Sequence, residues 1–316
     1  MTIAVTGANG FVGRAVLAAL EQAGIESRPL VRRHCELPKE TLVGDLSPGT
    51  NWLQALSGCD TVIHLAARVH VMSDRSQDPL AQFRSTNCAG TLRLADQAHQ
   101  SGVKRLVFVS SVKVLGEFTL PGTSFQRDQQ LNPADTYGMS KAEAETGLIR
   151  LAARTGLEVV IVRPPLVYGP GVGANFLQLM RWVARGVPLP LGAIFNQRTL
   201  VSVENLASLL LACATAPAAA GNIFHAGDGE DVSTTHLLQI LSEGMGRKSR
   251  LVPVPATLLR VGLNLIGAQK IAQRLCDNLQ LETASGWDKI NWSPPVSLRL
   301  GLQRTAQHFM NSIEVK

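Results

Sequence analysis

A tyrosine, a lysine four positions after it and a pair of serines earlier in the chain could together transfer a proton. A helix would place Tyr137 and Lys141 on one face, with the ammonium close to the phenol. A free phenol has a pKa of about 10 and is a poor acid–base group at neutral pH, but a nearby positive charge lowers that pKa by favouring the phenolate. Ser110 and Ser111 end an expected strand, where a serine hydroxyl can hold the substrate oxygen whose proton Tyr137 transfers. The pattern predicts acid–base chemistry at a substrate oxygen.

The beginning of the chain has the residues of a phosphate-binding turn. A strand-like run, Thr2 to Thr6, leads into Gly7-Ala8-Asn9-Gly10-Phe11-Val12-Gly13, and an amphipathic stretch follows from Arg14 to Gln22. Gly7 lets the chain turn off the strand, Gly10 lets the backbone approach a pyrophosphate, and Gly13 lets the helix pack on the sheet. The N–H groups at the start of that helix face the phosphate charge. Although the spacing is G-x-x-G-x-x-G, its place between strand and helix predicts a dinucleotide site.

The end of the second expected strand, Ser27 to Val31, bears on the choice of dinucleotide. NAD-specific proteins usually place an acid there for the ribose 2′-hydroxyl, whereas this strand is followed by Arg32 and Arg33. Two guanidinium groups suit a 2′-phosphate, so NADP(H) is favoured and NAD(H) remains possible, with both arginines then as surface charges. Asp45, after the next strand-like piece, could accept a hydrogen bond from the adenine amino group.

The order of elements predicts an α/β fold: a Rossmann-like, doubly wound parallel sheet with a smaller, intertwined C-terminal substrate lobe. The further expected strands are Thr61–Ala66, Leu106–Ser110 and Val159–Val162, and the expected helices are Thr50–Ser57, Arg84–Gln100 and Ser140–Thr155. After Arg163 several prolines break the pattern into short pieces, as in lobes built from loops. We expect residues 1–168 and roughly 197–228 to form the dinucleotide-binding unit, and roughly 169–196 and 229–316 to form the substrate lobe.

Composition narrows the function classes. The chain has 316 residues, 45% of them hydrophobic and 17% charged, with a formal net charge of +6. The basic residues are scattered, which suits an anionic small substrate and gives no indication of nucleic-acid binding. The five cysteines lack C-x-x-C spacing, so neither a disulfide framework nor a metal site is expected, and the protein is expected to be cytoplasmic. Two apolar stretches, Leu206–Gly221 and Leu258–Ile266, are too short or too interrupted to span a bilayer; both are interpreted as core helices, with a membrane surface as an alternative for the second.

In combination, these motifs resemble the extended short-chain dehydrogenase/reductase family, in its nucleotide-sugar epimerase/dehydratase branch. The resemblance extends over nearly the whole chain. Its segments are Thr6 to Gly13, His64 to Ala67, Asn87 to Thr91, Val109 to Ser111, Tyr137 to Lys141 and Arg163 to Pro165.

The resemblance implies a catalytic set of Ser111, Tyr137 and Lys141. Tyr137 would be the acid/base, Lys141 would tune it and hold the nicotinamide ribose, and Ser111 would orient the reacting oxygen. Asn87 would lie near the cofactor diphosphate, although it could equally cap the following helix, and His64 is interpreted as a core histidine at a strand end. The expected cofactor-binding residues are Gly7, Asn9, Gly10, Phe11, Val12, Gly13, Arg32, Arg33, Asp45, Leu46, Leu65, Ala66, Ala67, Asn87, Ser110, Tyr137, Lys141 and Pro164.

The reaction type depends on departures from the family pattern. Family dehydratases have an Asp-Glu pair where this chain has Val112 and Lys113, which argues against a 4,6-dehydratase. Epimerases usually have a tyrosine where Leu115 stands and an asparagine where Leu166 stands. The pattern looks most like the bacterial 4-keto-reductases of UDP-N-acetyl-6-deoxyhexoses, which supply polysaccharide precursors. A UDP-hexose 4-epimerase is the alternative, and a non-enzymatic nucleotide sensor is disfavoured by the Tyr/Lys pair.

The likeness to the keto-reductases rests on Ser111–Val114, Gly173–Phe176 and Asn196–Arg198. Arg198 is the first candidate for the substrate diphosphate, because a guanidinium binds phosphate oxygens in a bidentate manner, and it could also be a surface arginine. Asn175 could hold a phosphate or the uracil, or could cap a helix. The full expected substrate-binding set is Ser111, Lys113, Asn175, Arg198 and Arg274. Family relatives commonly form homodimers through two long helices, which here would be Arg84–Gln100 and Ser140–Thr155.

Overall fold

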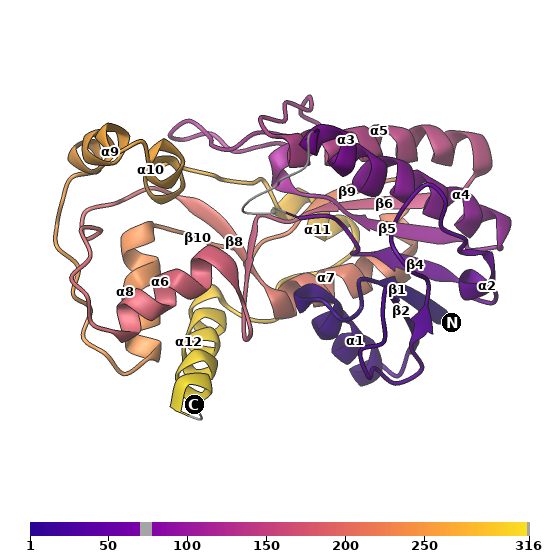
Figure 1. Cartoon of the computed structure of the whole chain (residues 1–316), viewed down its shortest axis with the longest axis horizontal. Helices are drawn as coiled ribbons and strands as arrows, with labels where there is room; N and C mark the ends of the chain where they lie inside the picture. Colours follow the sequence, from indigo (N-terminus) through magenta and orange to yellow (C-terminus); the bar gives the residue numbers. More distant parts are fainter. Residues whose placement is uncertain (70–77, 315–316) are drawn as a thin grey trace.

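A seven-stranded parallel sheet forms the centre of the molecule (Figure 1). The structure, a computed structural model, describes residues 1–69 and 78–314. The strand order is β3-β2-β1-β4-β5-β6-β9, and each neighbouring pair is parallel. The order reverses direction between β1 and β4, where such folds bind ligands beyond the carboxyl ends of the strands. The strands are β1 (Thr2–Thr6), β2 (Glu26–Val31), β3 (Thr41–Leu42), β4 (Thr61–His64), β5 (Arg105–Val109), β6 (Glu158–Arg163) and β9 (Ile223–His225).

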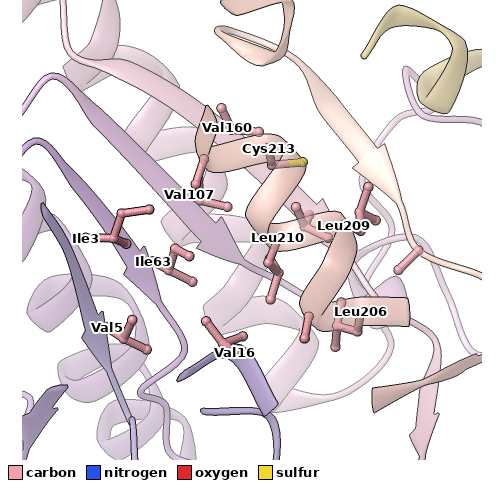
Figure 2. Packing of buried hydrophobic residues seen from close by; sticks show 14 of the residues in the cluster. Ile3, Val5, Val16, Ile63, Val107, Val160, Leu206, Leu209, Leu210 and Cys213 are labelled. Carbon is pink, nitrogen blue, oxygen red and sulfur yellow. The ribbon is translucent and has the colours of Figure 1, made fainter. Parts of the chain in front are cut away.

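Helices cover both faces of this sheet, which confirms the Rossmann-like fold. Helices α1 (Phe11–Gln22) and α7 (Val203–Thr215) pack together on one face, and α4 (Thr91–Gln100) and α5 (Thr136–Thr155) cover the other (Figure 1). In Figure 2, α7 lies beside the strands of the sheet, and its residues Leu210 and Cys213 belong to the same buried cluster as Val107 and Val160. The apolar stretch that contains α7 is therefore a core helix, as predicted.

The three helices predicted for the first part of the chain all have different limits, and the predicted helix Thr50–Ser57 is reduced to the single turn Leu53–Leu56. Helix α5 begins at Thr136, earlier than predicted, because Asp135 caps it. The predicted helix Arg84–Gln100 is two elements: a π-helical turn, η1 (Arg84–Gly90), precedes α4. The remaining short elements are α2 (Leu53–Leu56), α3 (Pro79–Phe83), the 3₁₀ turns η2 (Val112–Val114) and η3 (Pro217–Ala219), and α11 (Ala284–Lys289).

A smaller three-stranded sheet carries the second lobe. Its order is β10-β8-β7, from β10 (Asp231–Val232), β8 (Arg198–Ser202) and β7 (Leu166–Tyr168). Helices α6 (Ala174–Ala184), α8 (Thr234–Gly244) and α12 (Leu298–Glu314) share a hydrophobic core with it. The sequence assigns residues 166–168 and 198–202 to the dinucleotide-binding unit; in the structure these strands pair in the smaller sheet, where β8 lies between β7 and β10. The later part of that range, α7 and β9, does lie with the main sheet.

Helices α9 (Ala256–Leu265) and α10 (Gln269–Cys276) form one end of the second lobe (Figure 1). The prediction that Leu258–Ile266 is a core helix is wrong, because α9 has no buried residue. Only one side of it, with Leu259 and Ala256, packs against the lobe core. Within the described ranges, no helix is both long enough and apolar enough to cross a membrane.

Candidate active site

The glycine turn after β1 forms a cradle for a dinucleotide diphosphate. Gly7 has a φ of +66°, and a Cβ on it would lie 2.9 Å from the Ala66 nitrogen. A Cβ on Gly13 would lie 2.3 Å from the Gly7 carbonyl oxygen, so the first turn of α1 packs directly on the loop. Gly10 is the N-cap of α1 and has no side chain to occupy the N–H groups of that turn. An anion can therefore approach the positive end of the helix dipole.

A cavity of about 520 Å³ lies over this turn, between the two lobes. Asn9, Gly10 and Phe11 border it from the main sheet, and Pro170 and Gly171 border it from the loop after β7. At the end of β5 the Ser110 hydroxyl is buried, and the described residues offer it no hydrogen-bond partner. The open helix end, the cavity and the unsatisfied hydroxyl fit a bound nicotinamide dinucleotide.

The structure brings Arg32, a candidate for the 2′-phosphate, close to Asp45, the candidate for the adenine amino group. Arg32 Nη1 lies 3.5 Å from Asp45 Oδ1, and both side chains are mostly exposed, as is Arg33. Sequence reasoning missed Glu40, which accepts hydrogen bonds from the Cys35 thiol and His34 and so holds the loop that follows Arg33. These hydrogen bonds lower the pKa of the Glu40 carboxyl to about 2.

The predicted catalytic residues meet where β5 ends against the start of α5. Tyr137 lies in the first turn of α5 and Lys141 one turn later, so their expected placement on one helix is confirmed. The buried Lys141 ammonium donates a hydrogen bond to the Val109 carbonyl at 2.8 Å and lies 4.5 Å from the centre of the Phe108 ring. This contact ties α5 to the last residue of β5, directly before Ser110 and Ser111. The half-buried Ser111 caps η2, its Oγ accepting from the Lys113 N–H at 3.3 Å.

The pKa values differ from the expected pattern. Burial raises the pKa of Tyr137 to about 12, with a further contribution from the Asp135 carboxylate. Burial also lowers the pKa of Lys141 to about 7. The expectation that Lys141 brings the phenol pKa down is therefore not met, because desolvation of both side chains disfavours their charged forms. Tyr137 is therefore in its phenol form at neutral pH, and it can accept a proton only where the positive charge of Lys141 stabilises the phenolate.

Asp135 is a site residue that the sequence reasoning missed. Its Oδ1 accepts a hydrogen bond from the Gly138 N–H at 2.6 Å and caps α5, while its Oδ2 forms an ion pair with Lys113. A Cβ on Gly138 would lie 2.6 Å from the Lys113 carbonyl oxygen, so α5 and η2 are in close contact. Asp135 therefore fixes Tyr137 relative to Ser111. An aspartate just before a helix is a usual N-cap signal and could have indicated it.

Asn87 and His64 are buried, and their hydrogen bonds connect the elements around the site. The sequence offers helix capping as an alternative role for Asn87. This alternative is wrong, because Asn87 lies inside η1 and does not cap α4. Its side chain is buried and forms hydrogen bonds with the backbone N–H and C=O of Arg68 and with Ser140 Oγ. It thereby joins the loop that contains Leu65, Ala66 and Ala67 to α5. His64 is a core histidine as predicted, fully buried between Thr6 and Thr91, and burial lowers its pKa to about 3.

Two of the candidate substrate residues lie together in the second lobe. Arg198, the first residue of β8, donates to the Asp277 carbonyl at 3.0 Å, and burial is the main cause that lowers its pKa. The charge of Arg274 on α10 lowers it further, so the two guanidinium groups are neighbours. Asn175 is exposed in the first turn of α6, and the cap position there is Gly173. The alternative of a helix cap at Asn175 is therefore wrong.

Comparisons with known proteins agree with this geometry. The family model described as "NAD dependent epimerase/dehydratase family" matches residues 3–227. The chain is 41% identical to a UDP-glucose 4-epimerase of Vibrio cholerae, over 98% of this chain and 96% of that protein. Among solved structures, UDP-N-acetylglucosamine 4-epimerase from Bacillus cereus superposes with a TM-score of 0.80 at 18% identity, covering 98% of this chain and 99% of that one. MoeE5 in complex with UDP-glucose and NAD has a TM-score of 0.76 at 24% identity, covering 99% and 100%; at these identities both structures show the fold. The chain belongs to the NAD dependent epimerase/dehydratase family of enzymes.

Proposed function

We propose that this enzyme is a UDP-hexose 4-epimerase, acting on a sugar such as UDP-glucose or UDP-N-acetylglucosamine. The observation that carries the proposal is the 41% identity with a UDP-glucose 4-epimerase along 98% of the chain. The arrangement of Ser111, Tyr137 and Lys141 around the end of β5 supports it, because inversion at C4 needs a group that exchanges a proton with O4.

In this proposal a bound nicotinamide cofactor supplies reversible hydride transfer at C4. Tyr137 takes the O4 proton when the hydroxyl is oxidised and returns it when the ketone is reduced. Ser111 donates a hydrogen bond to the same oxygen, where charge develops. The Lys141 side chain has a pKa of about 7, so it can carry a proton near neutral pH. Its positive charge then stabilises the phenolate of Tyr137. Arg198 and Arg274 neutralise the substrate diphosphate.

A 4-keto-reductase is the second candidate, and it was the first preference from the sequence. Three features favour it: Arg32 and Arg33 follow β2 without an acid at the strand end, Lys113 stands beside Ser111, and Leu166 occupies a position where epimerases usually carry asparagine. The 41% identity to a UDP-glucose 4-epimerase extends over 98% of this chain, and we give it more weight than these local departures. NADP(H) preference belongs to this second candidate.

The two candidates differ in what they do with the cofactor. An epimerase keeps NAD bound through both half-reactions, whereas a reductase consumes NADPH and releases the oxidised form. We would denature freshly purified protein, identify the released dinucleotide, and follow UDP-glucose and UDP-N-acetylglucosamine by proton NMR without added cofactor. Stoichiometric NAD and formation of the C4 epimer support the epimerase. An empty protein that turns over only with NADPH and a UDP-4-ketosugar would replace it with the reductase.

A homodimer through α4 and α5 is part of the proposal. These helices pack closely, since a Cβ on Gly147 would lie 2.7 Å from the Leu92 side chain, and Ile149 of α5 is exposed. A shallow hollow of about 440 Å³ on this face is bordered by Leu92, Ala142 and Gly147. Light scattering of the wild type and of Ile149→Glu tests it: a dimer that becomes a monomer supports the proposed interface.

A further inference from the structure

Helix α9 exposes an apolar stripe along its outer side. Leu258, Val261 and Leu265 follow one another at three- and four-residue spacing, which places them on one helix face. Their exposed fractions are 63%, 58% and 83%. The opposite side carries Leu259 and Leu263, which are partly covered by the lobe. The helix is therefore apolar on two sides, and the protein core accounts for only one of them.

The exposed apolar surface continues beyond α9. Ile266 follows the stripe directly, and Ile271 on α10, which packs against α9, is also exposed. Figure 1 shows the two helices side by side along one edge of the second lobe, with α9 farther from the main sheet than α10. We call the set Leu258, Val261, Leu265, Ile266 and Ile271 the outer face. A contiguous apolar surface of this kind usually marks an interaction site.

The charged residues of α9 and α10 are all basic. Between Ala256 and Cys276 the sequence contains no acidic residue and three basic ones: Arg260, Lys270 and Arg274. Lys270 and Arg274 lie on α10 itself and are exposed, while Arg260 of α9 pairs with Asp277 at 2.5 Å. An apolar stripe with basic residues beside it complements a surface whose outer layer is anionic and whose interior is apolar.

We propose that the outer face docks on an anionic lipid membrane. Leu258, Val261 and Leu265 would enter the boundary between headgroups and acyl chains, and the exposed Lys270 of α10 would contact the lipid phosphates. A helix of ten residues is too short to cross the hydrocarbon layer, so the contact is interfacial. A stripe of three aliphatic side chains with few basic neighbours predicts reversible binding that weakens as salt is added.

The test uses the full-length protein and vesicles of phosphatidylcholine with and without phosphatidylglycerol. We expect co-sedimentation with the anionic vesicles only. The double variant Leu258→Glu/Leu265→Glu should bind at least about tenfold more weakly, and so should Lys270→Glu, because each basic side chain near a charged membrane adds appreciable binding energy. The matched control is Leu120→Glu, an exposed leucine outside the segment, which should bind like the wild type.

Two results would overturn the proposal: no binding of the wild type to anionic vesicles, or equal binding of the double variant and the control. Light scattering could give a third contradicting result. If the wild type self-associates without binding vesicles, and the double variant does not self-associate, the outer face would be assigned to a second copy of the chain. Because Leu258 and Leu265 are exposed, circular dichroism should show an unchanged fold. Turnover of a soluble UDP-sugar should also be unchanged in the double variant, so failure of docking and failure of the proposed epimerase activity are read separately.

Discussion

At the scale of single residues, the two tyrosines of the chain have opposite surroundings. Tyr137 lies at the start of α5 beside the serine pair, with the Phe83 ring edge-on at 6.2 Å. Tyr168 is fully buried in the second lobe, where its hydroxyl donates to Asp228 Oδ2 at 2.6 Å. The same phenol group is therefore placed for chemistry in one case and for packing in the other.

Replacing each tyrosine by phenylalanine should separate these roles. Tyr137→Phe should lower kcat by about 10²–10⁴-fold, the usual contribution of general acid–base catalysis, and leave the unfolding transition nearly unchanged. Tyr168→Phe should lower the free energy of unfolding by about 1–3 kcal/mol, because the buried Asp228 loses a donor, while kcat of the folded enzyme persists. Urea denaturation and steady-state kinetics on both variants check this. Full activity of Tyr137→Phe would remove the tyrosine from the mechanism.

The buried Lys141 should make stability depend on pH. Its pKa is about 7 in the folded protein, whereas that of a free lysine side chain is 10.5, so the unfolded chain binds the proton more tightly. Stability should rise as pH increases from 7 toward 10.5, and the full cost of the buried charge is present below pH 7. Lys141→Met should therefore stabilise the protein by about 1–4 kcal/mol at pH 6 and by much less at pH 10, while abolishing turnover.

The control for this prediction is Lys104→Met, which removes an exposed lysine. It should change stability little at any pH, since surface substitutions usually lie within about 0.5 kcal/mol. Denaturation midpoints across the pH range provide the measurement. If Lys141→Met and Lys104→Met give parallel curves, the Lys141 ammonium is not desolvated.

At the scale of elements, the start of α5 depends on Asp135 in two separable ways. Asp135→Asn can still cap the helix but loses the charge that pairs with Lys113 and raises the pKa of Tyr137. The phenol pKa should therefore fall, and the limb of the pH–rate profile that reports it should move to lower pH. Asp135→Ala should show the same shift and in addition lose about 0.5–2 kcal/mol of stability with the cap. A profile identical to the wild type in Asp135→Asn would contradict the electrostatic role.

Elements with a local signal could be predicted, and those that depend on distant packing could not. The glycine turn, the strand ends and the Tyr137–Lys141 helix are set by short-range periodicity and by turn residues. The placement of β7 and β8 in a separate sheet depends on pairing between Leu166–Tyr168 and Arg198–Ser202, far apart in sequence. The role of Asn87 depends on Arg68 and Ser140, and the exposure of α9 depends on how little of the lobe reaches it. A local sequence pattern does not indicate which residues far apart in the chain will pair or pack together.

At the scale of the whole molecule, one buried polar network joins the two lobes. Asn205 of α7 donates to Asp228 Oδ1 at 2.6 Å and exchanges two hydrogen bonds with the backbone of Val296, just before α12. Asp228 also accepts from Tyr168 and from the Ser202 N–H. The cavity over the glycine turn lies between the same lobes, with Val203 and Glu204 of α7 on its border. The network therefore connects α7, which borders this cavity, to the second lobe.

Replacing Asn205 by leucine should loosen the second lobe before the main sheet. The change leaves both backbone groups of Val296 without partners, each at a cost of about 1–3 kcal/mol, and removes one of the two hydrogen bonds that Asp228 Oδ1 accepts. We expect faster amide hydrogen exchange in α8 and α12 than in β1, β4 and β5, with weaker cofactor binding, because part of the cavity border then moves. Ser208→Ala is the matched control on α7: it removes one hydrogen bond, from Trp292 Nε1 at 2.9 Å, and should cost about 1 kcal/mol without affecting α12 selectively. If hydrogen exchange in Asn205→Leu is accelerated equally in the main sheet and in α12, the two lobes unfold as a single unit. The network would then contribute to overall stability and not to the relative placement of the lobes.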